Sequence, residues 1–428
     1  MKKITLFILL WGFHISNAQE NYIDFNQYKT QTLVNKTTPT KAILNRARHI
    51  VFEEIKPILP DEIFWRTAKD IFCGRLHDRW NIEVDAERSA AFLQQLMEVG
   101  VGNFVEQIRG VYSSTDAKGD TVVLSGKLIL PKHGKIKNII VVCHYTIGSN
   151  REAPSECLSF ESLLALKGYA VVMPDYIGYG ITHQYKHPYL HLQSVARSSV
   201  DMMLAIHPYL ATIGRAPESS FVILVGYSQG GAAVLALQRE LEKNYPSIFP
   251  IQHVYAGGGP YDLAGTYDFA IREDKIVIPC VIPMLIQGMN EGDALGLNMN
   301  DFFVDPILSH YDLWINSKNY TIGAINRMIN ETRPSKLLTA QARDTTNVTT
   351  RRLYGALQHN SLLNFKPQSP LYIFHSQEDT WVPFLNGEHL YKSFQSHGIS
   401  NVEYDFGSYG DHMCAGVEFI MNVFHMLP

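Results

Sequence analysis

The sequence has 428 residues, of which 46% are hydrophobic and 18% charged, and its formal net charge at pH 7 is -4. A chain of this length can bury a large core and has room for more than one domain. The weak negative charge and the lack of a long basic run argue against a nucleic acid partner. No P-loop motif occurs, and the glycines at 256–260 lack the spacing of a dinucleotide-binding loop.

The first 18 residues have the layout of a secretory signal peptide. Two lysines precede an apolar run from Ile4 to Phe13, and the small residues up to Ala18 come before Gln19. That run is too short for a typical membrane span, and no later segment has about 18 uninterrupted apolar residues. The sequence predicts export to the periplasm or outside the cell without a stable membrane span. An uncleaved N-terminal anchor is the alternative.

Export would permit disulfide bonds, of which the cysteines can form at most two. Cys143 lies in an apolar run and is predicted to be a small core residue rather than a nucleophile. The five cysteines are Cys73, Cys143, Cys157, Cys280 and Cys414.

Residues 19–103 are polar with a helical pattern and predict an N-terminal helical extension without a chemical cluster. The next two segments, 104–115 and 121–131, alternate apolar and polar residues around the turn "DAKGD". They predict an antiparallel pair of strands.

From residue 138 onward, apolar strands alternate with helical stretches, including a helix over 192–210. Such alternation predicts an α/β fold with a mostly parallel central sheet flanked by helices. We expect the catalytic domain to comprise residues 104–259 and 366–428. Its later strands are predicted at 138–145, 169–176, 221–228, 251–259, 370–376 and 401–407.

One long stretch interrupts this alternation. Residues 260–365 are rich in Met, Leu, Asn and Tyr and are too many for an ordinary connection. They predict an inserted helical cap, or lid, over the carboxyl ends of the strands, where ligands bind in open α/β sheets. Met284 and Met289 in the cap are candidate contacts for an apolar substrate. The alternative is a structural subdomain that does not touch the site.

The stretch "ILVGYSQGGAAVLALQ" (223–238) predicts a strand, a very tight turn and a helix, with Ser228 at the tip. Side chains two positions before and after the serine would collide across so sharp a bend, and Gly226 and Gly230 remove that collision. This pattern indicates a nucleophile elbow. The alternative is that Ser228 only caps the helix.

A nucleophilic serine needs a base and an acid that orients the base. Asp379 follows one late strand and His412 follows the next, in the order serine, acid, histidine. Glu378 and Asp411 are the competing carboxylates, while Asp405 lies within a strand pattern. We favour Asp379 because Val382-Pro383, three residues later, suits a turn below the acid.

Backbone N–H groups are expected to stabilise the oxyanion formed at the acyl carbon. One donor is predicted to be Gln229, and the second Tyr145 or Thr146, in the loop "CHYTIGSN". His144 is a candidate substrate contact or, about as readily, a core histidine that shapes this loop. Tyr227, next to the nucleophile, is a further candidate contact.

Three histidines, His183, His187 and His191, are spaced by four residues, as metal ligands on a helix would be. Pro188 interrupts such a helix, so we predict no metal site. Serine-based chemistry requires no cofactor, and we predict none.

Together these motifs resemble the α/β-hydrolase superfamily, and more narrowly the secretory lipase family and related bacterial serine esterases. The resemblance covers about residues 104–425 and rests on "PDYIGYG", "HPYL", "GYSQGG", "GGGPYDL" and "HSQEDTWVP". It implies hydrolysis of carboxylic esters by a Ser/Asp/His triad, with a lid before the strand that bears the acid. Many relatives have glycine after the oxyanion-loop histidine, where this chain has Tyr145, a side chain expected to narrow the acyl site.

The sequence thus predicts an exported serine esterase or lipase that acts on a small-molecule or lipid ester. An exopeptidase on the same fold is an alternative, in which Glu291 or Asp293 would bind a substrate amine. A non-catalytic binding protein on the same scaffold is a third.

Overall fold

The computed structural model describes residues 22–27, 104–157 and 160–427. The predicted signal peptide and nearly all of the predicted N-terminal extension lie outside the described residues. The described ranges comprise the predicted catalytic domain and cap, apart from residues 158–159 and 428.

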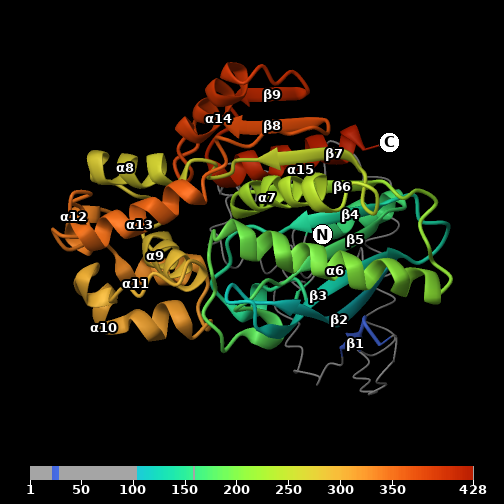
Figure 1. Ribbon diagram of the computed structural model, residues 1–428, viewed down its shortest axis with the longest axis horizontal. Coiled ribbons are helices and arrows are strands. Elements are labelled where there is room, and N and C mark those ends of the chain that lie inside the picture. The colour runs from blue at the N-terminus through green and yellow to red at the C-terminus, as the bar shows by residue number, and fades with distance from the viewer. Residues whose placement is uncertain (1–21, 28–103, 158–159, 428) are drawn as a thin grey trace, which may run out of the picture.

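The core of the protein is a nine-stranded sheet in the order β1-β2-β3-β5-β4-β6-β7-β8-β9 (Figure 1). β2 pairs antiparallel with β3, and β3 pairs antiparallel with β5, whereas every pair from β5 to β9 is parallel. The predicted α/β fold with a mostly parallel sheet is confirmed. The strands are β1 (Ile23–Asp24), β2 (Val105–Thr115), β3 (Thr121–Pro131), β4 (Ile139–Cys143), β5 (Ala170–Pro174), β6 (Val222–Tyr227), β7 (Ile251–Gly257), β8 (Leu371–Ser376) and β9 (Val402–Gly407).

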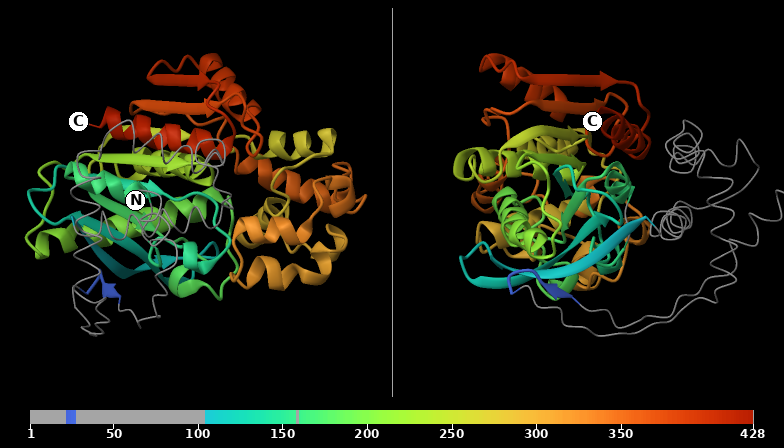
Figure 2. Two further views of the ribbon diagram at one scale, coloured as in Figure 1. Left: turned by 180° about the vertical axis from the view of Figure 1, so that it is seen from behind. Right: turned by 90° about the vertical axis from the view of Figure 1, so that its right-hand side faces the viewer.

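Helices cover both faces of this sheet. Side chains alternate between the faces of a strand, and in β4 Val141 packs into the cluster shared with helices α6 (Leu192–Thr212) and α7 (Gln229–Asn244). Its neighbour Val142 packs into the cluster that contains helix α15 (His412–Met426). The view from behind in Figure 2 shows α15 on the face opposite α6 and α7. Burial on both faces explains why the central strands are almost wholly apolar.

The first described residues differ from the predicted helical extension. Ile23 and Asp24 form a short strand that pairs in parallel with β2 at the edge of the sheet. Phe25 is fully buried, and a Cβ at Gly110 would lie only 2.0 Å from its ring. Gly110 has no side chain and therefore leaves space in β2 for the ring of Phe25. This tertiary contact outweighs the helical pattern of the local sequence.

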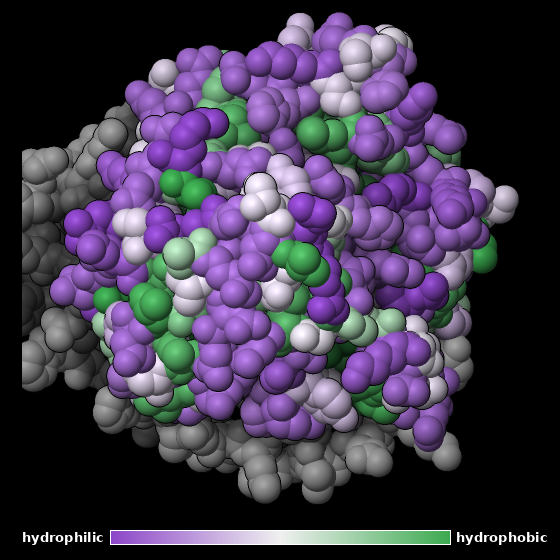
Figure 3. Space-filling view, turned by 60° about the vertical axis from the view of Figure 1, so that its left-hand side comes forward, coloured by the Kyte–Doolittle hydropathy of each residue, from purple (hydrophilic) through white to green (hydrophobic). Residues whose placement is uncertain are grey.

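Six α-helices lie between β7 and β8, as a separate lobe at the carboxyl ends of the strands (Figure 1). We call residues 260–365 the cap. The side of the molecule that carries the cap is mostly hydrophilic, with hydrophobic residues in small separate patches (Figure 3). The cap helices are α8 (Leu263–Glu273), α9 (Val281–Gly292), α10 (Ile307–Tyr311), α11 (Ile322–Ile329), α12 (Pro334–Leu337) and α13 (Val348–His359).

After the cap, the chain returns to the sheet through β8, helix α14 (Leu385–Ser396) and β9 before ending in α15. The carboxyl ends of β4, β6, β8 and β9 therefore meet at one edge of the sheet, because all are parallel. Within the described ranges, none of the helices has the length and apolar content that crossing a bilayer would require.

Candidate active site

Ser228 sits in the turn between β6 and α7 with φ of 59°. This left-handed backbone is strained for a serine, and strain of this kind collects at functional sites. A Cβ at Gly226 would lie 2.0 Å from the carbonyl oxygen of Gly230, across the bend. A Cβ at Gly230 would meet the carbonyl oxygen of Cys143 at 2.0 Å, so there the obstacle is the end of β4 rather than the turn itself.

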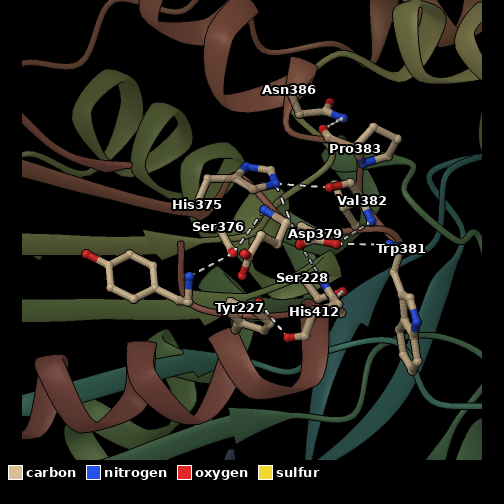
Figure 4. Close-up of polar contacts among 12 residues, drawn as sticks. Tyr227, Ser228, His375, Ser376, Asp379, Trp381, Val382, Pro383, Asn386 and His412 are labelled. Carbon is tan, nitrogen blue, oxygen red and sulfur yellow. Dashed lines mark hydrogen bonds and ion pairs between the residues drawn. The ribbon is translucent and has the colours of Figure 1, made fainter. Parts of the chain in front are cut away.

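Ser228, His412 and Asp379 form one continuous hydrogen-bonded chain (Figure 4). The serine Oγ lies 2.8 Å from His412 Nε2, and His412 Nδ1 lies 2.6 Å from Asp379 Oδ2. All three residues are buried. They come from the ends of three different elements: the turn after β6, the turn after β8 and the first residue of α15.

Asp379 is held on both of its oxygens. Its Oδ1 accepts hydrogen bonds from the N–H groups of Trp381 and Val382, each at 2.9 Å. Its Oδ2 is therefore the oxygen that faces His412 Nδ1.

Two aromatic rings lie against the imidazole of His412. The ring of Trp381 stacks on it with a centroid distance of 5.3 Å, and that of Tyr227 lies 5.0 Å away. The Tyr227 hydroxyl also donates to the carbonyl oxygen of His412, at 2.7 Å. Tyr227, predicted as a substrate contact, is thus placed against the histidine and braces its backbone.

The competing carboxylates have other partners. Glu378 accepts from the N–H of Gly410 at 2.7 Å, and Asp411 caps α15 by accepting from Cys414 N at 3.0 Å. Asp405 accepts from the hydroxyl groups of Tyr372 and Tyr409. Of the carboxylates weighed in the sequence, Asp379 is the one that contacts His412.

Ser376 links the loop that carries Asp379 to the loop that carries His412. Its hydroxyl donates to the carbonyl oxygen of Gly410 at 2.7 Å and accepts from the N–H of Tyr409 at 3.2 Å (Figure 4). Together with the Glu378 contact to Gly410, this hydrogen bonding fixes the separation of the two loops.

The loop after β4 is anchored from below. His144 stacks on Tyr176 with a centroid distance of 4.2 Å, and its Nε2 lies 3.2 Å from the carbonyl oxygen of Asp175. Burial lowers the pKa of His144 to about 4, so the ring is neutral at pH 7. The structure places His144 as a buried support of this loop, the second of the two roles expected for it.

Side-chain hydroxyls hold the same loop from the side. Thr146 Oγ1 lies 2.8 Å from the Tyr189 hydroxyl, and Tyr179 donates to the carbonyl oxygen of Ile147 at 2.5 Å. Tyr145, between these anchors, is 46% exposed. Burial nevertheless raises the pKa of its hydroxyl well above the usual value, so the exposed part of the residue is not the hydroxyl end.

Gln229, the first residue of α7, is oriented by His187. Burial lowers the pKa of His187 to about 3, and its Nδ1 donates to the carbonyl oxygen of Ile177 at 2.6 Å. The unprotonated Nε2 can therefore accept from the Gln229 amide, 3.3 Å away. Neither His187 nor Gln229 needs a metal to explain its contacts.

The cap touches the loop after β4 directly. A Cβ at Gly148 would lie 2.6 Å from the carbonyl oxygen of Tyr320, and the N–H of Asn150 donates to the carbonyl oxygen of Lys318 at 2.8 Å. The Lys318 ammonium is buried over the ring of Tyr179, 5.4 Å from its centroid, and donates to the carbonyl oxygen of Ile315 at 2.6 Å. The cap and the loop are therefore one packed unit.

Burial lowers the pKa of Lys318 to about 8, which makes stability depend on pH. The unfolded chain keeps a lysine pKa of about 10.4, so between about pH 8 and 10 the unfolded state binds more protons and the free energy of unfolding rises with pH. We expect Lys318→Met to be more stable than wild type at pH 7, and this advantage to shrink by about 2 kcal/mol at pH 9.5.

Urea unfolding of both proteins at pH 7.0 and 9.5 measures this change. Lys392→Met, at an exposed lysine of α14, serves as the control and is expected to show the same difference from wild type at both pH values. An advantage of Lys318→Met that does not change with pH would contradict the prediction.

The remaining predicted site residues lie away from open surface. Met284 and Met289 are buried on α9 in the main core cluster, and Gly288 between them packs against the backbone of Tyr189. His191 Nδ1 lies 2.7 Å from the Ser194 hydroxyl. Among the residues that the structure describes, no cluster of three or more His, Cys, Asp or Glu is arranged to hold a metal ion.

The cysteines take two forms. Cys143, Cys157 and Cys280 are free, and burial raises the pKa of the Cys143 thiol to about 11, as fits a core residue. Cys414 is disulfide-bonded. Cys73 lies outside the described residues.

The profile of the family described as "Secretory lipase" matches residues 153–419, well over half of the chain, and this range contains Ser228, Asp379 and His412. The chain belongs to the secretory lipase family. As a member of this family, the protein is a carboxylic ester hydrolase. We found no significant match among curated proteins.

Solved structures share the fold of this chain at low sequence identity. The rice cell wall degrading esterase LipA from Xanthomonas oryzae has a TM-score of 0.69 at 22% identity, over 78% of this chain and 95% of that chain. A putative hydrolase from Legionella pneumophila has 0.67 at 21%, over 78% and 94%. Candida antarctica lipase A in its closed state has 0.56 at 16%, over 73% and 74%.

Sequence reasoning missed several side chains around the triad. Ser376, Trp381 and Tyr189 act through contacts between distant segments, which no local pattern reveals. His375 contacts Asp379, four residues later in the chain. His375 alone left a signal, because a histidine next to the end of the apolar run "LYIF" is unusual in a buried strand.

Proposed function

We propose that this protein is an exported serine hydrolase that cleaves carboxylic esters through an acyl-enzyme on Ser228. The observation that carries the proposal is the unbroken chain of hydrogen bonds from Ser228 through His412 to Asp379. A serine hydroxyl becomes a strong nucleophile only when a base takes its proton as it attacks.

In this mechanism His412 Nε2 accepts the serine proton while Oγ attacks the acyl carbon. Asp379 Oδ2 accepts from Nδ1–H, which keeps Nε2 unprotonated before attack and stabilises the imidazolium afterwards. His412 then protonates the leaving alcohol. In the second half of the cycle it takes a proton from water, which attacks the acyl-enzyme and releases the acid.

The N–H groups of Gln229 and of Tyr145 or Thr146 stabilise the oxyanion. Support comes from the close packing of Gly230 against the carbonyl oxygens of Cys143 and His144, which brings the start of α7 next to this loop. None of the three N–H groups is bonded to an acceptor among the described residues. Each donor in such a site is worth about 3 kcal/mol in the transition state.

The cap would supply the apolar wall for the acyl or alcohol group, and cleavage after Ala18 would release the protein to the periplasm or the outside. The disulfide at Cys414 favours an oxidising compartment. We expect the aromatic side chains of Tyr145 and Trp381 to contact an ester group bound near Ser228. No cofactor enters this chemistry.

The alternatives gain little support. An exopeptidase would need a free acid for the substrate amine, yet Glu291 pairs with Lys186 at 3.0 Å and Asp293 lies 3.4 Å from His191. A binding protein would have no need for the strained φ of Ser228 or for its aligned base.

A fluorophosphonate probe tests the proposal, because only an activated serine reacts with it quickly. We expect stoichiometric labelling on the peptide that carries Ser228, together with turnover of p-nitrophenyl esters from acetate to palmitate. Labelling without turnover of any ester would favour an amide or an unusual acyl group. Failure of both reactions would overturn the proposal.

A further inference from the structure

A second histidine lies beside the carboxylate of Asp379. His375, on β8, is fully buried, and its Nε2 lies 3.6 Å from Asp379 Oδ2, the oxygen that also receives His412. Figure 4 shows dashed lines from this carboxylate to both imidazoles. None of the steps in the proposed catalytic cycle uses His375.

The contacts of His375 define where its proton is. Nε2 lies 3.0 Å from the carbonyl oxygen of Val382, which can only accept, so Nε2 carries the hydrogen. Nδ1 is buried and has no hydrogen-bond partner among the described residues. A Cβ at Gly387 would lie 3.3 Å from Nδ1, so this side of the ring is tightly packed.

His375 is neutral in this environment. Burial lowers the pKa of its imidazole, which the negative charge of Asp379 offsets only in part. A distance of 3.6 Å is too long for a hydrogen bond, so the effect on the carboxylate is that of the positive end of an N–H dipole. That dipole lies next to Oδ2 in a site from which water is excluded, where electrostatic interactions are strong.

Packing alone does not account for a histidine here. The buried Nδ1 lacks a partner among the described residues, which destabilises the fold, and an apolar ring would fill the same space without that penalty. The Nε2–H group, in contrast, donates to Val382 in the turn that holds Asp379, and Nε2 lies 3.6 Å from the carboxylate itself.

We propose that His375 is a positioning residue whose Nε2–H fixes the Asp379 carboxylate toward His412. The inference rests on the proposed roles of Ser228, Asp379 and His412. His375 contacts neither the reacting serine nor a substrate, and it acts through Asp379. Its loss would therefore slow the chemical step and leave substrate binding unchanged.

The test is a double-mutant cycle with kcat and KM measured on p-nitrophenyl butyrate. We expect His375→Phe to lower kcat about 10- to 100-fold, with KM within about twofold of wild type. His375→Gln, whose amide can reach the position of Nε2, is expected to recover kcat to within about threefold of wild type. In the Asp379→Asn background, His375→Phe is expected to cause no further loss, because its target is gone.

Two results would overturn the inference: an unchanged kcat in His375→Phe, or the same loss of kcat with and without the Asp379 carboxylate. Circular dichroism and the thermal midpoint establish that each variant folds. If His375→Phe does not fold, His375→Asn replaces it, since its shorter amide cannot reach Val382. An Asp379→Asn single variant with full activity would instead overturn the proposed triad, which separates the two failures.

Discussion

Ser228→Ala is expected to lose ester hydrolysis by about 10⁵-fold or more in kcat, while the protein still folds. The substitution removes the attacking oxygen and leaves His412 with no proton to accept. Alanine tolerates the φ of 59° no worse than serine does, so the elbow should persist. The measurement is hydrolysis of p-nitrophenyl butyrate by the mature protein, at enzyme concentrations high enough to detect trace activity.

Ser396→Ala is a suitable control, because this serine is exposed and donates to the carbonyl oxygen of Ser393 within α14. We expect its kcat to match wild type. Activity in Ser228→Ala within about tenfold of wild type would show that another group attacks the ester.

Asp379→Asn is expected to lower kcat by about 10⁴-fold. Oδ1 accepts from the N–H groups of Trp381 and Val382, so the side-chain oxygen of asparagine must take that place. Its NH₂ group then faces His412 Nδ1 and donates to it. This contact selects the tautomer with the proton on Nε2, which cannot accept the proton of Ser228.

Glu378→Gln provides the matched control, since it changes the adjacent carboxylate to an amide in the same loop. Glutamine keeps an oxygen that can accept from the N–H of Gly410, so we expect kcat within about twofold of wild type. Kinetics of both variants on one ester, with circular dichroism to establish folding, give the comparison. Equal losses of kcat in the two variants would mean that kcat depends on the conformation of the loop rather than on the Asp379 carboxylate.

Much of the α/β core could be predicted because its signals are local. The apolar runs at 138–145 and 221–228 indicated strands that are buried on both faces of the sheet. The glycines around Ser228 indicated a turn so tight that residues with a Cβ would collide in it. The assignment of Asp379 over Glu378 was harder, since neighbouring carboxylates look equivalent in a sequence. The choice rested only on the Val382-Pro383 pattern, which suits a turn below the acid. The contact of Glu378 with Gly410 could not be predicted from the sequence.

Other features could not be predicted because they depend on contacts between distant segments. Phe25 forms part of the core because Gly110, far along the chain, leaves space for it in β2, and the local pattern around Phe25 indicated a helix. Tyr227 was expected to face a ligand, yet its hydroxyl reaches the backbone of His412. In both cases the deciding partner is remote in the chain.

The contact between Gly148 and Tyr320 limits how such enzymes can be recombined. A chimaera that exchanges residues 260–365 for the equivalent segment of a relative would also replace the carbonyl groups of Lys318 and Tyr320 against which the loop after β4 is packed. The cap and the alignment of that loop are therefore inherited together. A graft intended to alter specificity must carry residues 144–150 from the same donor as the cap.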